Sequence, residues 1–92
     1  MDGAAAEQIA VQAFGWLSAD DELVLAFLGQ AGADMSDLAE MAGDPQFLAA
    51  VLDFVLSSDD LVYAFADFAS LAPEKVGIAR QVIPGAEIIN WT

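Results

Sequence analysis

The sequence predicts an all-α protein, a compact bundle of about six short helices. Apolar residues recur at steps of three and four along most of the chain, which is the spacing of one helix face. No sustained two-residue alternation, the pattern of a half-buried strand, precedes the last few residues. With 92 residues, of which 58% are hydrophobic, the chain can close one core and is too short for several.

The first three helices are expected in the N-terminal half. Residues 4–17 form the first. Ser18 is expected to cap the second, because a serine hydroxyl can accept a backbone N–H of the first turn. Gly32 and Asp34 are expected to end that helix and begin a short third one near residues 35–42. The side chains expected in the core are Ile9, Ala13, Trp16, Leu17, Leu23, Val24, Phe27, Leu28, Met35, Leu38 and Met41.

The run Gly43-Asp44-Pro45 predicts the start of a fourth helix. Glycine suits a helix end, aspartate caps the next helix, and proline at its first position needs no N–H partner. Apolar residues cover most of the circumference of this helix, so it is expected to be the central and most buried one. The apolar residues of this helix are Phe47, Leu48, Val51, Leu52, Phe54, Val55 and Leu56.

Two further helices complete the predicted bundle. Ser57 or Ser58 opens the fifth, whose first turn holds two aspartates that suit the positive end of the helix dipole. Pro73 opens the sixth, and Pro84-Gly85 ends it. The fifth helix is expected to turn Tyr63 and Asp67 towards water. The core residues expected from both helices are Leu61, Val62, Phe65, Phe68, Val76, Ala79, Val82 and Ile83.

Two stretches of the chain resemble each other. Residues 21–27 align with residues 59–65 at an offset of 38, with five identities in seven. This favours two similar three-helix units that close on each other, with the second, fourth and fifth helices at the centre. Chance similarity between two amphipathic helices with acidic starts is the alternative. The expected organisation is a single domain of residues 1–85, with units 4–43 and 44–85, and a C-terminal tail of residues 86–92.

A family resemblance rests on the residues around the fourth helix. Gly43-Asp44-Pro45 is followed by Phe47-Leu48, Val51-Leu52-Asp53-Phe54 and Asp59-Asp60-Leu61 in that order. This pattern resembles a family of small bacterial proteins, mostly alphaproteobacterial, that is catalogued as a domain of unknown function. The resemblance covers roughly residues 5–85. It implies a helical, cytoplasmic protein, and it implies no activity, cofactor or functional residue.

Composition excludes several classes of function. The chain has no cysteine and no histidine, so disulfides, thiol nucleophiles, Cys/His zinc sites and imidazole catalysis are all absent. Fifteen carboxylates against two cations give a net charge of −13, which repels nucleic acid and anionic membrane surfaces. The first residues lack the basic region of a signal peptide, and no uncharged run could span a bilayer. We therefore expect a cytoplasmic protein without direct contact to nucleic acid or membrane.

The acidic clusters at residues 20–22 and 59–60 have two interpretations. Clustered carboxylates could hold a hard metal ion such as Mg²⁺ or Ca²⁺, or act as a catalytic acid and base. The spacing of a calcium loop is missing, however, and the helix dipole explains both clusters alone. We therefore expect no catalytic residue, no metal ligand and no cofactor.

The C-terminal tail carries the strongest candidates for an interface. Ile88, Ile89 and Trp91 follow a Pro-Gly stop and have no predicted helix of their own, so they are expected to dock on an apolar surface. Trp91 could cover the groove between the two units of its own chain. It could instead insert into a second subunit or a partner, where Tyr63 would extend the patch.

The function that we expect is that of a small non-enzymatic interaction or adaptor module. It would form a homodimer or bind a protein partner through an apolar patch. The carboxylates are spread over the helix starts, which suits a general adaptation to solubility. An alternative is an inhibitor that imitates nucleic acid and occupies a basic protein. A metal-binding protein or carboxylate enzyme is the third interpretation.

Overall fold

The computed structural model describes residues 1–32 and 44–83 and is all-α and compact. Within these residues it has five helices and no strand. The all-α prediction is therefore confirmed. The predicted helix near residues 35–42 lies outside the described residues, so the count of six stays a prediction. The helices are α1 (Gly3–Ser18), α2 (Asp21–Ala31), α4 (Pro45–Leu56), α5 (Asp59–Ala69) and α6 (Glu74–Val82).

Aspartate side chains begin three of the helices. The carboxylate of Asp2 accepts the N–H of Ala5 at 2.8 Å, and that of Asp44 accepts the N–H of Gln46 at 2.9 Å. Each bond satisfies a backbone donor that the first helical turn leaves without a partner. The predicted start of α4 at Asp44 and Pro45 is thus confirmed.

The start of α2 differs from the prediction. Asp20, and not Ser18, caps this helix, because its Oδ1 accepts the N–H groups of Glu22 and Leu23 at 2.9 and 3.2 Å. The hydroxyl of Ser18 instead donates to the carbonyl of Gly15 within α1 at 3.2 Å. Ser18 is the last residue of α1, so its side chain is too early to reach the first turn of α2.

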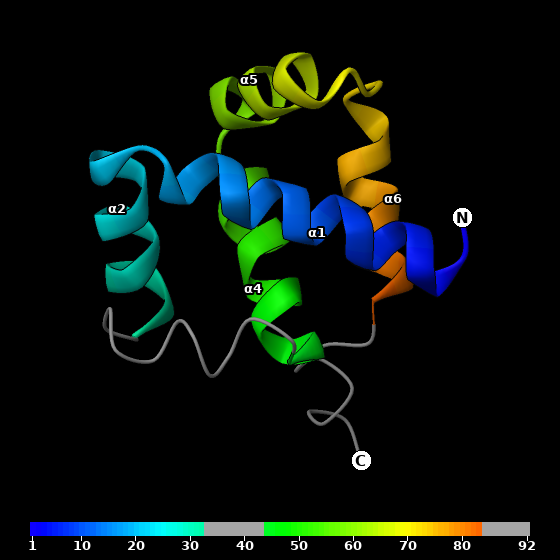
Figure 1. Ribbon diagram of the computed structural model, residues 1–92, viewed down its shortest axis with the longest axis horizontal. Coiled ribbons are helices and arrows are strands. Elements are labelled where there is room, and N and C mark those ends of the chain that lie inside the picture. Colours follow the sequence, from blue (N-terminus) through cyan, green and yellow to red (C-terminus); the bar gives the residue numbers. More distant parts are fainter. Residues whose placement is uncertain (33–43, 84–92) are drawn as a thin grey trace.

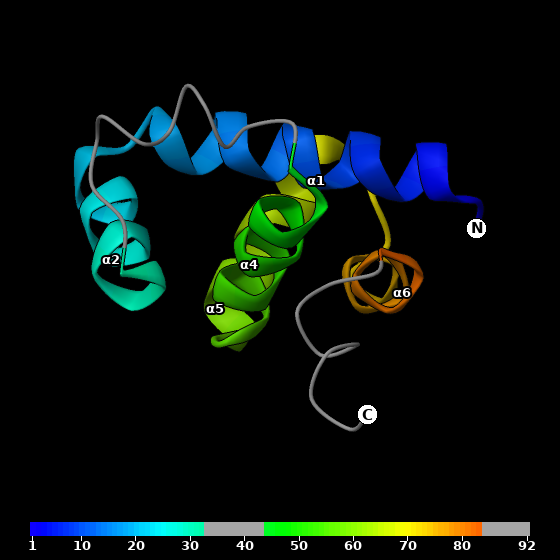
Figure 2. The ribbon, with the colours of Figure 1, turned by 90° about the horizontal axis from the view of Figure 1, so that it is seen from below.

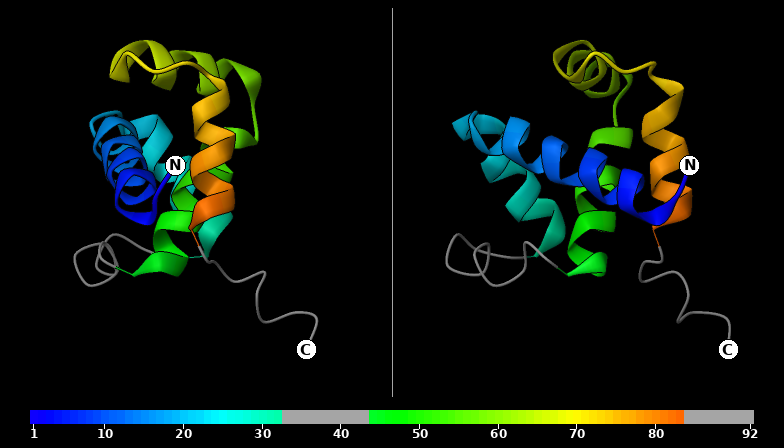
Figure 3. Two further views of the ribbon diagram at one scale, coloured as in Figure 1. Left: turned by 90° about the vertical axis from the view of Figure 1, so that its right-hand side faces the viewer. Right: turned by 45° about the vertical axis from the view of Figure 1, so that its right-hand side comes forward.

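Helix α1 lies across three other helices. Figure 1 shows it running from the N-terminus on the right to α2 on the left, and the view from below shows α2, α4 and α6 side by side beneath it (Figure 2). Helix α5 lies over one end of the molecule, where it contacts α1 and α4 (Figure 3). Both α1 and α4 pack against every other described helix. The centre therefore consists of α1 and α4, and the prediction that α2 and α5 share it is wrong.

Small side chains allow α1 to occupy this central place. Ala6, Ala10 and Ala13 are fully buried and lie on one face, with Leu17 one turn further on. An alanine methyl group lets the axis of one helix approach a neighbour closely. The buried face of α1 thus consists largely of small residues. A prediction that looks only for large apolar side chains underestimates how deeply such a helix is buried.

Helix α4 fills the interior with large side chains. Phe47 packs edge-on against Phe14 of α1 and Phe27 of α2, with ring centroids 5.2 and 5.6 Å apart. Phe27 also meets Phe54 of α4 at 5.7 Å. Such edge-to-face pairs add stability beyond the burial of the rings themselves. The prediction that this helix is the most buried one is confirmed by its seven buried residues Phe47, Leu48, Ala49, Val51, Leu52, Phe54 and Val55.

The internal similarity extends to the backbone. Helix α1 ends at residue 18 and α4 at residue 56, and α2 and α5 begin and end 38 residues apart. Both of these later helices stop at a residue in the left-handed conformation, Gly32 with φ 72° and Ser70 with φ 58°. Residues 18–32 and 56–70 therefore follow the same plan. The two complete three-helix units stay a prediction, because the third helix of the first unit lies outside the described residues.

Candidate functional site

The first candidate surface is the outer face of α5. We give this name to Asp60, Tyr63, Ala64, Asp67 and Phe68, which are all exposed and occupy one side of the helix. Tyr63 is 62% exposed, as predicted, and Phe68 is 63% exposed. Aromatic side chains are enriched in the buried centres of protein interfaces. The outer face of α5 thus combines two exposed aromatic rings with carboxylates.

The exposure of Phe68 corrects the sequence prediction, which placed it in the core. Helix α5 carries apolar residues around more than half of its circumference, and α1 and α4 cover only the side with Phe65 and Ala66. The ring of Trp16 on α1 meets Phe65 at a centroid distance of 5.6 Å. Phe68 lies beyond that contact and is left in water.

The corresponding helix of the first half exposes an apolar residue at the equivalent position. Leu25 of α2 is 63% exposed and corresponds to Tyr63 at the offset of 38. Each residue follows two carboxylates by one helical turn, Asp21 and Glu22 in α2 and Asp59 and Asp60 in α5. The matched backbone segments therefore share a matched surface feature, an apolar side chain beside an acidic helix start.

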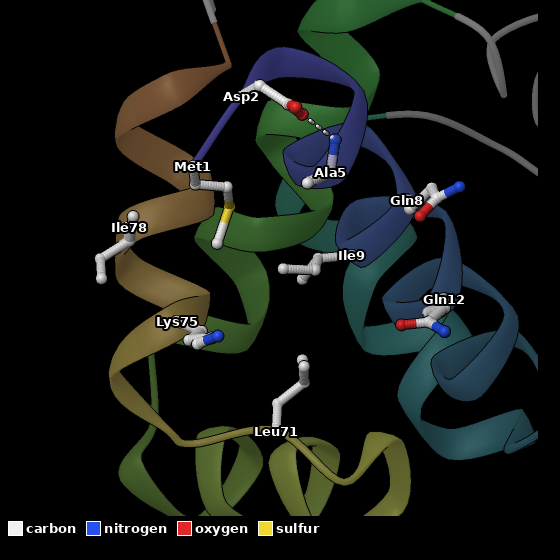
Figure 4. A pocket seen from close by; sticks show the side chains of 9 residues that line it. All are labelled: Met1, Asp2, Ala5, Gln8, Ile9, Gln12, Leu71, Lys75 and Ile78. Carbon is white, nitrogen blue, oxygen red and sulfur yellow. Dashed lines mark hydrogen bonds between the residues drawn. The ribbon is translucent and has the colours of Figure 1, made fainter.

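The second candidate is a groove between α1 and α6, with a volume of about 560 Å³. Figure 4 shows Ile9, Met1 and Leu71 pointing into the space between the two helices. Leu71 reaches it because the chain leaves α5 through the left-handed turn at Ser70, where the N–H of Leu71 donates to the carbonyl of Ala66 at 2.9 Å. The residues that line the groove are Met1, Asp2, Ala5, Gln8, Ile9, Gln12, Leu71, Lys75 and Ile78.

The two cationic side chains of the chain have different surroundings. Nε of Arg80 lies 2.7 Å from Oδ1 of Asp53, so this ion pair joins α6 to α4. The Arg80 side chain is only 18% exposed, against 52% for Asp53. Lys75 is exposed and lines the α1–α6 groove. The groove thus combines apolar side chains with the ammonium group of Lys75 and the carboxylate of Asp2.

The described carboxylates all lie at the surface. Within residues 1–32 and 44–83 no polar or charged side chain is buried, and no group of three or more acidic side chains is placed to hold a metal ion. Asp20 and Asp44 accept backbone N–H groups at helix starts, as the helix dipole favours. The arrangement of these carboxylates serves capping and surface charge.

The predicted interface residues of the tail are not among the described ones. Ile88, Ile89 and Trp91 lie outside the described residues, so their contact with Tyr63 stays a prediction. The α1–α6 groove was not expected as a site from the sequence. It is lined by two segments of the chain, residues 1–12 and 71–78, and no local sequence pattern predicts that these segments lie side by side.

Comparisons with known proteins give one match. A family model described as a protein of unknown function (DUF3572) matches residues 3–86. Neither the curated proteins nor the solved structures contain a match to the chain. Among the described helices, none has the length and apolar character needed to cross a membrane.

Proposed function

The chain belongs to the DUF3572 family, and we propose that it is a small, acidic, non-enzymatic interaction module that binds a basic protein through the outer face of α5. The observation that carries this proposal is the exposure of Tyr63 and Phe68, both above 60%, on one helix. Leaving two aromatic rings in water forgoes a large burial energy, about 1.5–3 kcal/mol for a side chain the size of phenylalanine. A partner that covers them recovers that energy.

The carboxylates of the same face indicate the charge of the partner. Asp60 and Asp67 lie within one turn of Tyr63. A surface with lysine or arginine side chains around an apolar centre would complement them, and the net charge of −13 would speed its approach.

A homodimer through this face is disfavoured by the same charges. In a two-fold symmetric interface the same patch meets itself, so Asp60 and Asp67 of one copy would face the same residues of the other. Like charges at an interface cost several kcal/mol. We therefore expect sedimentation of the purified protein to give a monomer of 9.6 kDa.

The test is affinity capture from a native lysate, with proteins identified by mass spectrometry, at about 50 and 200 mM salt. Wild type is compared with the double variant Tyr63→Ser/Phe68→Ser and with Val11→Ser, a control at an exposed apolar residue of α1. We expect basic proteins to be captured by wild type and by the control, and lost with the double variant. Their recovery should fall only modestly with salt.

Two outcomes would contradict the proposal. Equal capture by all three proteins would exclude the outer face of α5 as the binding surface. Capture that is unchanged in the double variant but falls steeply with salt would instead support an inhibitor that imitates nucleic acid. Charge alone would then hold the complex together. Circular dichroism of each variant checks that the helices are retained.

A further inference from the structure

The α1–α6 groove leaves apolar side chains in water next to the point where the described chain ends. Ile78 is 43% exposed on one wall, and Leu71 is half-buried at one end. Helix α6 forms this wall, and Ile83 is its C-cap residue. Residues 84–92 follow directly in the sequence. We infer that the tail, residues 86–92, docks in the α1–α6 groove of its own chain.

The tail is long enough to reach the whole groove. Along α6, the distance from Ile83 back to Lys75 is about 12 Å at 1.5 Å per residue. Eight residues of extended chain beyond Ile83 span up to about 26 Å. Pro-Gly is a dipeptide typical of turns, so Pro84-Gly85 can reverse the chain. After that reversal, residues 86–92 can run back along α6 as far as Leu71.

The chemistry of the groove matches that of the tail. Its volume of about 560 Å³ is in the range of pockets that enclose small ligands, about 300–1,000 Å³, so it accommodates several side chains. Returning along α6, the tail brings Ile88 and Ile89 towards Ile78 and carries Trp91 on towards Lys75. An ammonium group over the face of an indole ring is a favourable contact. The docked tail thus covers the apolar walls and contacts the ammonium group of Lys75.

The rim of the groove on the α1 side suits the extended backbone of a docked tail. Gln8 and Gln12 of α1 line this rim one turn apart (Figure 4). Each amide side chain offers donors and an acceptor, so it can bond to the N–H and C=O groups that an extended segment leaves without partners.

Docking within one chain is favoured over exchange between two copies. A short link between α6 and the tail gives the tail an effective concentration in the millimolar range at its own groove. Exchange would also bring two molecules of net charge −13 together. The occupant is therefore the chain's own tail.

Tryptophan fluorescence tests the contact. The chain has two tryptophans, so Trp16→Phe, which keeps an aromatic ring against Phe65, leaves Trp91 as the reporter. We expect acrylamide to quench Trp91 several-fold less efficiently in the folded protein than in urea. In this background Ile78→Glu, which places a charge in the groove, should restore efficient quenching. Leu25→Glu, at an exposed site on α2 that is not part of the groove lining, should leave quenching unchanged.

Three results would overturn the inference. Trp91 could be quenched equally well in the folded protein and in urea, which would exclude docking. Leu25→Glu could act as strongly as Ile78→Glu, which would show that the groove is not the site. Trp91 could be protected from acrylamide only at high protein concentration, where sedimentation shows a dimer. This result would place the tail in the groove of a second copy.

Engineered cysteines give a second test that keeps Trp16. The chain has no cysteine, so within one chain the pair Ile78→Cys/Ile89→Cys can form only the intended disulfide. Its control is Leu25→Cys/Ile89→Cys, with the first cysteine on α2 at the opposite side of the molecule (Figure 1). With oxidised glutathione, we expect the groove pair to form a disulfide within one chain several-fold faster than the control pair. Equal rates, or disulfide-linked dimers from the groove pair, would contradict docking within the chain.

Discussion

At the scale of single residues, backbone geometry distinguishes the two matched helix ends. Gly32 and Ser70 both hold positive φ angles, 72° and 58°, but only glycine adopts this conformation without a steric penalty. The turn at Ser70 also directs the chain so that Leu71 reaches the groove. The protein therefore has an unfavourable residue at a position where the fold needs a left-handed turn.

Replacing Ser70 by glycine is predicted to stabilise the protein. The variant Ser70→Gly relieves the left-handed strain, and after the larger entropy loss of glycine on folding the expected gain is about 0.5–1 kcal/mol in the free energy of unfolding. Ala19→Gly is the control, because Ala19 follows α1 with φ −76° and needs no such freedom. Urea unfolding measures both. A gain of equal size at both positions would show that left-handed strain is not the cause.

At the scale of the elements, local patterns predicted the start of α4 and failed where packing between helices decides. Asp44-Pro45 marks a start through contacts within one turn, so the sequence is sufficient there. Phe68 belongs to an apolar stripe of α5, but whether that stripe is covered depends on where α1 crosses. The central place of α1 was also not predicted, because a pattern of alanines alone does not reveal that four helices pack against it.

Larger side chains on the alanine face of α1 are predicted to destabilise the protein. Ala10→Leu inserts a larger side chain at a position that is fully buried, and we expect it to cost about 1–3 kcal/mol in the free energy of unfolding. Val11→Leu, at the exposed neighbouring position, should change it by less than about 0.5 kcal/mol. Chemical unfolding of the two variants decides the point. Wild-type stability for Ala10→Leu would mean that the helices around α1 are loosely packed.

At the scale of the whole molecule, the charge acts against compactness. Two like charges 10 Å apart in water repel by about 0.4 kcal/mol, and the chain has fifteen carboxylates and two cations. The ion pair between Arg80 and Asp53 offsets little of this, because half-exposed pairs contribute at most about 1 kcal/mol. Self-repulsion among the surface carboxylates therefore outweighs attraction in the folded state.

Salt is accordingly predicted to stabilise the protein. Raising NaCl from about 10 mM to 1 M shortens the Debye length from roughly 30 to 3 Å and screens the repulsion, so Tm should rise by several degrees. The double variant Glu7→Gln/Asp67→Asn removes two charges away from the helix starts and should show a smaller rise. Calorimetry measures both. A Tm that is flat or falls with salt would contradict the dominance of repulsion.

The packing of α1 against α6 has a consequence for protein synthesis. These are the first and the last described helices, and each covers part of the other. As the ribosome releases the chain, α1 emerges early but must wait for residues 74–83 before its alanine face is enclosed. The α1–α2 and α4–α5 hairpins can pair as soon as each is made, whereas the final arrangement assembles only when translation has passed residue 83.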